Sequence, residues 1–276
     1  MRRPMIIALA VGALVASGPA SAQSYDPDID PLELKCVQAT SKTLAKFTGA
    51  KTKCVLQCMS GARKGLNPVA DCYAPYSGGA ADCITDPTVG AETKSIAAIQ
   101  RKCDEVPYPG RGCPECYDGG DCSASGYAGQ STASIESQID GFATSIWCDP
   151  LNADPDIQKC QDNVARTFAK FVKCKTRCYD KCNVEIARGH IPPGSCTPPS
   201  PSYYVTSICI ADGFRGCEAH ARDAIDKRCL FVGSNPPCYG SAFDTGFEWV
   251  NSFETAVDGT VAQTYCGSPS GGFLSE

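Results

Sequence analysis

The stretch KFTGAKTKCVLQC at residues 46–58 returns as KFVKCKTRCYDKC at residues 170–182. Both stretches keep Lys-Phe, Lys-Thr and a Cys-x-x-x-Cys ending, but the second has Cys174 where the first has Ala50. The surrounding cysteines recur in the same order. Cys36, Cys54, Cys58, Cys72, Cys83, Cys103, Cys116 and Cys148 correspond to Cys160, Cys178, Cys182, Cys196, Cys209, Cys229, Cys238 and Cys266. We therefore predict two tandem homologous repeats, at residues 23–148 and 149–276.

The first 22 residues have the composition of a secretory signal peptide. Arg2 and Arg3 precede a short apolar run, and Ala20-Ser21-Ala22 provides the small residues of a cleavage site. That run is too short to span a bilayer, and no later stretch is apolar enough to do so. We expect residues 1–22 to be removed and the mature chain to be exported, to the periplasm or the extracellular space.

Charge and cysteine content restrict the class of protein. The chain has 25 basic and 30 acidic residues, and loss of Arg2 and Arg3 with the signal makes it still more acidic. Nucleic acid is therefore not an expected partner, because binding to phosphates requires a basic surface. All 20 cysteines follow the signal, which is typical of a disulfide framework in an oxidising compartment.

Four cysteines are private to one repeat and occur in twos. Cys174 and Cys217 replace Ala50 and Ala91, while Cys113 and Cys122 occur only in the first repeat. Disulfides require cysteines to be gained in pairs, because a single added thiol would be a liability in an oxidising compartment. Metal thiolates impose no such parity.

Helical spacing dominates each repeat and predicts a mostly all-α fold. A stripe at intervals of three and four residues marks the first helix of the second repeat: Cys160, Val164, Phe168, Phe171, Cys174, Cys178 and Cys182. Asp30-Pro31 and Asp154-Pro155 are expected helix starts, each an N-cap followed by Pro. A second helix is expected from Asp86-Pro87, or from its counterpart Asp212, past Cys103 or Cys229.

The third segment of each repeat carries two conflicting signals. Ile135, Ile139, Phe142 and Ile146 have helical spacing, whereas Asp140-Gly141 and Asp258-Gly259 are hairpin signals. We expect a helix that is broken at Asp-Gly. Each repeat is thus predicted to be an antiparallel helical hairpin with a third segment pinned by disulfides.

Two facing antiparallel helices pair residues whose numbers have a constant sum, because both rise equally per residue. Cys174–Cys217 and Cys182–Cys209 share one sum, and Cys160–Cys229 is within two of it; Cys58–Cys83 and Cys36–Cys103 behave alike in the first repeat. The remaining cysteines are assigned as Cys54–Cys72, Cys178–Cys196, Cys116–Cys148, Cys238–Cys266 and Cys113–Cys122. Because every predicted bridge lies within one repeat, each repeat is expected to fold alone.

Motifs with possible chemistry have plainer explanations. Cys113-Pro-Glu-Cys116 resembles a redox motif, but it lies in a loop and Asn235 replaces its first cysteine in the second repeat. Cysteines on helices could instead bind Cu(I), which makes a metal-thiolate store the first alternative function. A small secreted hydrolase is the second alternative, because it could use His190 or His220. No Gly-x-Ser-x-Gly motif accompanies either histidine, and both are expected to be solvated. We predict no catalytic residue, metal or cofactor.

The predicted first helices are basic, and their cations are Lys42, Lys46, Lys51, Lys53, Lys170, Lys173, Lys175, Arg177 and Lys181. Such a run is usually a solvated helix face. The functional alternative is a patch for an anionic envelope polymer or an acidic partner. The sequence therefore predicts an exported, disulfide-stapled structural or binding protein without enzymatic activity, whose partner is an unidentified protein or envelope polymer.

Overall fold

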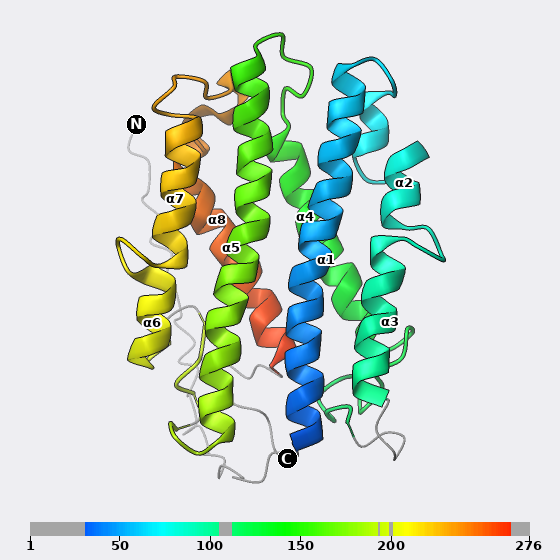
Figure 1. The fold of residues 1–276 in the computed structure, drawn as a ribbon, viewed down its shortest axis with the longest axis vertical. Helices are drawn as coiled ribbons and strands as arrows, with labels where there is room; N and C mark the ends of the chain where they lie inside the picture. Colours follow the sequence, from blue (N-terminus) through cyan, green and yellow to red (C-terminus); the bar gives the residue numbers. More distant parts are fainter. Residues whose placement is uncertain (1–30, 105–111, 193, 199–200, 266–276) are drawn as a thin grey trace, which may run out of the picture.

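Two long antiparallel helices, α1 (Pro31–Arg63) and α5 (Pro155–Ala187), lie side by side and form the middle of the molecule (Figure 1). The computed structural model describes residues 31–104, 112–192, 194–198 and 201–265. Within these ranges every regular element is a helix and no strand occurs, which confirms the mostly all-α class. The predicted signal peptide at residues 1–22 lies outside the described residues.

Shorter helices cover the two long ones. We call residues 31–148 and 149–265 the first and second halves. After α1, the first half contains η1 (Val69–Cys72), α2 (Gly78–Ile84), α3 (Ala91–Asp104) and α4 (Tyr127–Ile146). After α5, the second half contains α6 (Tyr204–Ala211), α7 (Cys217–Arg228), η2 (Pro237–Ala242) and α8 (Gly246–Thr264). Helices α3 and α7 flank the central pair, while α4 and α8 cross behind it (Figure 1).

Helix α5 begins as the sequence predicts. The Asp154 side chain accepts a hydrogen bond from the Asp156 backbone N–H, and Pro155 occupies the first helical position, where it loses no intrahelical bond. The predicted cysteine and aromatic stripe faces the interior, and only Cys174 in it is partly exposed. Helix α1 begins at Pro31, and the expected cap Asp30 lies outside the described residues.

A turn separates the second helix of each half from a short helix before it. Asp86 Oδ1 accepts hydrogen bonds from the backbone N–H groups of Thr88 and Val89, and Asp212 Oδ1 accepts from those of Phe214 and Arg215. A glycine closes each turn, since a Cβ on Gly90 would lie 2.6 Å from backbone atoms of Asp86. The turns place α2 and α6 out of register with α3 and α7.

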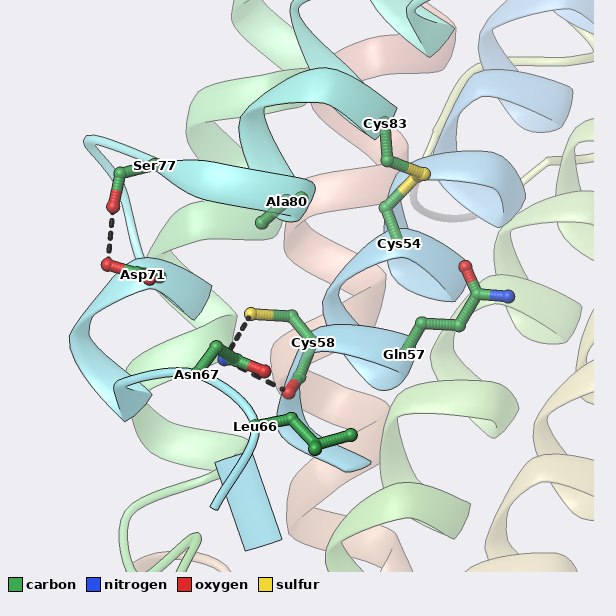
Figure 2. A pocket seen from close by; sticks show the side chains of 10 residues that line it. Cys54, Gln57, Cys58, Leu66, Asn67, Asp71, Ser77, Ala80 and Cys83 are labelled. Carbon is green, nitrogen blue, oxygen red and sulfur yellow. Dashed lines mark hydrogen bonds between the residues drawn. A yellow bond between two sulfur atoms is a disulfide. The ribbon is translucent and has the colours of Figure 1, made fainter. Parts of the chain in front are cut away.

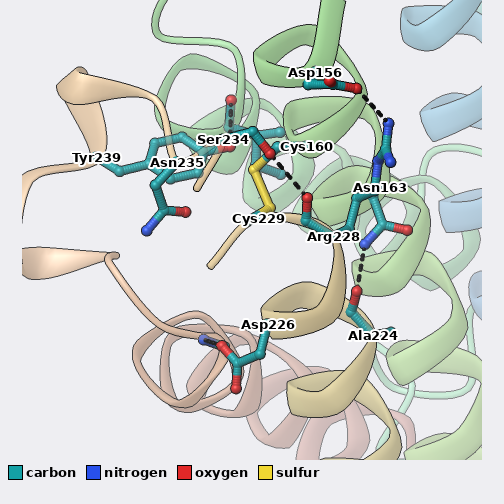
Figure 3. Close-up of a disulfide and its surroundings, with 12 residues drawn as sticks. Asp156, Cys160, Asn163, Ala224, Asp226, Arg228, Cys229, Ser234, Asn235 and Tyr239 are labelled. Carbon is teal, nitrogen blue, oxygen red and sulfur yellow. Dashed lines mark hydrogen bonds and ion pairs between the residues drawn. A yellow bond between two sulfur atoms is a disulfide. The ribbon is translucent and has the colours of Figure 1, made fainter. Parts of the chain in front are cut away.

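Four disulfides join the residues that the sequence analysis paired: Cys36–Cys103, Cys113–Cys122, Cys160–Cys229 and Cys174–Cys217. Figure 3 shows Cys160–Cys229 tying α5 to the end of α7, with Cα atoms 5.0 Å apart. Arg228 pairs with Asp156 at 3.2 Å, and Asn163 Nδ2 donates to the Ala224 carbonyl at 2.8 Å (Figure 3). The constant-sum rule works for Cys36–Cys103, Cys160–Cys229 and Cys174–Cys217 because no turn interrupts α3 or α7 between the paired cysteines, whereas Cys113–Cys122 is a local loop bridge.

Four predicted pairs are wrong because their partners exchange by one helical turn. The predictions Cys54–Cys72 and Cys58–Cys83 become Cys54–Cys83 and Cys58–Cys72, and Cys178–Cys196 and Cys182–Cys209 become Cys178–Cys209 and Cys182–Cys196. Residue sums do not separate the two choices, because those of Cys54–Cys83 and Cys58–Cys83 lie equally far from that of Cys36–Cys103. The Asp86 and Asp212 turns place Cys83 and Cys209 on separate short helices, α2 and α6, which face the earlier cysteine of each Cys-x-x-x-Cys pair (Figure 2).

The third segments connect the two halves, which corrects two more pairings. Cys148 bonds to Cys238 across the halves, so the predicted Cys116–Cys148 and Cys238–Cys266 bridges are wrong. Cys116 is disulfide-bonded, and Cys266 lies outside the described residues. The reason is that each Cys-Tyr segment packs on the other half. The Tyr239 hydroxyl donates to the Ile146 carbonyl at 2.9 Å, and the Tyr117 hydroxyl donates to the Thr264 carbonyl.

The hydrophobic core is also shared between the halves. Phe142 of α4, Phe168 of α5 and Phe253 of α8 meet with ring centroids 4.8–5.3 Å apart. Cys148–Cys238 shows that the expectation of bridges within one half only is wrong. The prediction that each repeat folds alone rested on that expectation, and the shared core gives a second reason against it. The boundary between residues 148 and 149 stays a prediction.

Helices α4 and α8 run without a break through Asp140-Gly141 and Asp258-Gly259, so the expected interruption is wrong. Neither glycine has a positive φ, and a Cβ on either would meet no atom within 4 Å. A hairpin turn at Asp-Gly requires a left-handed glycine, which the packing of both helices against the core excludes here.

We expect Gly141→Ala to stabilise the protein by about 0.5–1 kcal/mol, because glycine in a helix interior has excess conformational freedom in the unfolded chain. Gly65→Ala is the matched control. Gly65 has φ +71° after α1, so its replacement should destabilise the protein. Guanidinium chloride unfolding of the oxidised protein measures both changes. Destabilisation by Gly141→Ala would instead indicate a turn at this position.

Candidate functional site

The principal candidate site is a basic groove between α1 and α5, with a volume of about 500 Å³. Its floor contains the small residues Ala45, Gly49 and Ala169. Its rims carry cations from both helices, namely Lys42, Lys46, Lys170, Lys173 and Arg177. Small residues let the two helices leave a channel along their line of contact, and the cations border that channel on both sides.

The five rim cations are available to a ligand. All five side chains are exposed, and none forms a salt bridge with another described residue. The one carboxylate in the groove, Asp180, is buried and accepts a hydrogen bond from the Ser41 hydroxyl at 2.6 Å and another from the Tyr265 hydroxyl. Burial raises the pKa of Asp180, while its hydrogen bonds and the nearby Lys42 ammonium lower it and offset part of that rise.

Lys51, from the same basic run, is not part of this surface. Its side chain is fully buried, and its Nζ atom lies 2.8 Å from Glu136 Oε1 and 2.6 Å from Asp140 Oδ1. The Tyr76 ring lies 4.9 Å from the ammonium, and its hydroxyl donates to Asp140. This cluster attaches α4 to α1.

The second half contains the corresponding cluster. Lys175 is fully buried, with its Nζ atom 2.6 Å from Glu254 Oε1 and 2.7 Å from Asp258 Oδ1. The expectation of a solvated face is therefore wrong for Lys51 and Lys175. A signal was present in the sequence: a lysine and a Glu-x-x-x-Asp pair occur in both halves, and that pair lies on one helix face. The buried ammonium groups cannot meet a substrate, so the clusters are structural.

A third carboxylate stands near each cluster, on α3 or α7. Burial and the neighbouring Glu136 raise the pKa of Glu92. Burial and the neighbouring Glu254 raise the pKa of Glu218 to about 6. Each buried lysine thus lies near three carboxylates and can neutralise the charge of only one. The third carboxylate, Glu92 or Glu218, is partly exposed, so water solvates part of the remaining negative charge.

A second hollow, of about 350 Å³, lies between α1, η1 and α2 (Figure 2). The disulfide Cys54–Cys83 and Cys58 line it, and Asn67 Nδ2 donates to Cys58 Sγ at 3.3 Å. Asp71, the acidic residue among those that line it, accepts a hydrogen bond from the Ser77 hydroxyl. This pair is exposed to solvent and no histidine is among the lining residues, so the hollow lacks the oriented base that activates a serine in hydrolases.

The described cysteines are all disulfide-bonded, as expected in an oxidising compartment. In that part of the chain no thiolate is available to bind Cu(I), and Cys113 and Cys116 do not form a dithiol, because Cys113 bonds to Cys122. His190 is exposed and its Nδ1 atom lies 2.8 Å from Glu185, while His220 is exposed on α7. The structure brings neither histidine to the groove.

None of the described helices combines the length and apolarity needed to cross a membrane. Comparison of the chain with protein-family models, with curated proteins and with solved structures finds no match.

We expect Lys175→Met to lower the free energy of unfolding by about 3 kcal/mol, because it leaves Glu254 and Asp258 without their buried counterion. Lys173→Met, two residues away on the exposed rim, should change it by less than about 0.5 kcal/mol. Guanidinium chloride unfolding at pH 7 measures both. Equal effects of the two variants would contradict a structural role for the buried cluster.

We expect the benefit of Glu218→Gln to depend on pH. A raised carboxyl pKa means that protonated Glu218 stabilises the fold below about pH 4.5, and that this stabilisation is lost as pH rises through about 6. Glutamine does not titrate, so the free energy of unfolding of the variant, relative to that of the parent, should increase from pH 4.5 to pH 7. The expected increase is up to about 1 kcal/mol, a figure that already allows for the partial exposure of Glu218. Thermal unfolding at both pH values measures this difference, and a constant difference would contradict it.

Proposed function

We propose that the protein is an exported, non-enzymatic binding protein whose α1–α5 groove binds an anionic polymer of the cell envelope. The observation that carries this proposal is the set of five exposed cations on both rims of one groove, none of which forms a salt bridge within the described part of the chain. The chain as a whole has a net charge of −5, so this concentration of positive charge is local. A local basic site on an acidic protein attracts anions while the remaining surface repels them.

The shape of the groove favours an extended chain over a folded acidic partner. Within the groove the row on α5 from Lys170 to Arg177 spans about 10 Å, and Lys53 on α1 and Lys181 on α5 follow at helical spacing beyond the lining residues. Two rows with a floor of small side chains between them suit a narrow chain with repeated negative charges. A folded partner would need a contact of roughly 800 Å² on each side, whereas a groove of this kind admits a single strand.

The disulfide network supports export and persistence outside the cytoplasm. Disulfides staple α1 and α5 to the shorter helices, so the backbone that carries the cations needs little reordering when a ligand binds. No catalytic constellation accompanies the groove in the described part of the chain, which is why we propose binding and not turnover.

We expect the exported full chain to bind fluorescein-labelled alginate, a polyuronate, in fluorescence anisotropy, with an affinity that falls as the salt concentration rises. The double variant Lys46→Gln with Lys173→Gln should lose at least about tenfold in affinity, because it removes one cation from each rim. The matched control, Lys64→Gln with Lys227→Gln, removes the same charge from exposed lysines outside the groove.

Equal affinities of the two double variants would show that net charge, and not the groove, attracts the polymer. Neutral dextran should not bind. Tighter binding of poly-L-glutamate than of alginate would keep the groove as the site but replace the proposed polymer by an acidic polypeptide.

A further inference from the structure

Two disulfides of the second half lie against each other. Cys174–Cys217 joins α5 to α7, and Cys178–Cys209 joins α5 to α6, from positions one helical turn apart on α5. The Cys178 and Cys217 sulfurs, which belong to different bonds, are 3.6 Å apart. The Sγ atoms of Cys174, Cys178 and Cys217 all lie within 4.8 Å of one another. Sulfurs at this distance are in van der Waals contact, the starting geometry for thiol–disulfide exchange.

The outer and inner sulfurs of this array differ in exposure. Cys178 and Cys217 are each 2% exposed, whereas Cys174 and Cys209 are only partly buried. Cys178 and Cys209 both line a groove of about 510 Å³ between α5 and α6. Because Cys174 and Cys209 are the more exposed of the four, an external thiolate reaches them more readily than Cys178 and Cys217.

Cys217 is the first residue of α7, and its N-cap, Gly216, provides no side-chain cap. A helix start favours negative charge on a nearby sulfur, which offsets part of the cost of a buried Cys217 thiolate. Cys217 is therefore the leaving group when the Cys174 sulfur is attacked. Its thiolate would be formed in contact with the neighbouring disulfide.

From this geometry we propose that Cys174–Cys217 and Cys178–Cys209 form a thiol–disulfide exchange site, in which attack of an external thiolate on Cys174 ends in release of a thiolate on Cys209. The co-substrate is a free thiol of the exported compartment. This site is independent of the α1–α5 groove and of the polymer binding proposed above.

The exchange is balanced at each step. The external thiolate attacks Cys174 Sγ, a mixed disulfide forms, and the Cys174–Cys217 bond breaks with its electron pair leaving on Cys217. The Cys217 thiolate attacks Cys178 Sγ, the Cys178–Cys217 bond forms, and the Cys178–Cys209 bond breaks. The Cys209 thiolate is released into the α5–α6 groove, where it can take a proton from water or attack a second disulfide. No net oxidation or reduction occurs.

The first half provides an internal comparison. Ala50 and Ala91 stand at the positions of Cys174 and Cys217, so Cys54–Cys83 has no equivalent neighbouring bridge. The other close sulfur group among the described residues, Cys36, Cys103 and Cys122, is buried throughout, at no more than 1% exposure. External thiols cannot reach it, so exchange is expected only in the second half.

Two single variants of the full chain test the site without any added reductant. Cys174→Ala leaves a thiol on Cys217, which should attack Cys178 and appear as a free thiol on Cys209. Cys209→Ala leaves a thiol on Cys178, which should appear on Cys174. Both variants should contain a new Cys178–Cys217 bond. The control Cys83→Ala should keep its thiol on Cys54.

Alkylation under denaturing, non-reducing conditions followed by peptide mapping locates the thiols. The expected result is at least a tenfold increase over the parent protein in labelling of Cys209 in Cys174→Ala, and of Cys174 in Cys209→Ala. Labels confined to Cys217 and Cys178 would overturn the proposal.

The parent protein tests the site if either variant fails to fold. Exposure to limiting glutathione should yield glutathionylated Cys174 together with the Cys178–Cys217 bond and a labelled Cys209. Opening of Cys174–Cys217 with Cys178–Cys209 intact would overturn the proposal, as would complete resistance of all four cysteines while the protein stays folded. Neither result depends on polymer binding, so failure of this site and failure of the groove are distinguishable.

Discussion

The close antiparallel contact of α1 with α5 is the constraint on which the other features depend. Polar contacts hold it at both ends. Ser41 donates to buried Asp180 at one end, and Arg63 pairs with Asp162 at 2.9 Å at the other. Small residues between these ends let the helices approach, and the same residues form the floor of the basic groove. Charge could therefore accumulate on the rims without disturbing the core, because lysine and arginine stems run along the surface with their cationic ends in water.

The third helices convert two similar halves into one body. Lys51 and Lys175 each bind two carboxylates one turn apart, which orients α4 and α8 along the long helices. The C-terminal ends of α4 and α8 then meet the Cys-Tyr segment of the opposite half, where Cys148–Cys238 makes the connection covalent. Buried ion pairs of this kind contribute little net stability, because desolvation offsets most of their attraction. Their geometric specificity determines which helix ends meet.

Similar halves provide two proposed sites of different chemistry. The groove uses both halves together, since each contributes one rim. The exchange site uses only the second half, because Cys174–Cys217 lies beside Cys178–Cys209, whereas Ala50 and Ala91 accompany Cys54–Cys83 in the first half. A disulfide is usually explained by stabilisation through a smaller unfolded ensemble. Contact between the sulfurs of these two bridges gives Cys174–Cys217 a chemical consequence as well.

The sequence by itself determined the helical class, the N-cap of α5 and the pairings Cys160–Cys229 and Cys174–Cys217. The helical class and the N-cap follow from local periodicity. The two pairings follow from the equal rise per residue of two facing helices, and that rise is itself set by residues near in the chain. Tertiary structure decided the pairing of Cys178 with Cys209, because the Asp212 turn shifts α6 by an amount that residue numbers do not encode. It also decided the unbroken course of α4 and α8 through Asp-Gly, the burial of Lys51 and Lys175, and the Cys148–Cys238 bridge. Each of these features depends on which surfaces meet across the two halves. Hydrophobic burial is the largest favourable contribution to folding, but it is non-directional, so those surfaces are selected only in the assembled core.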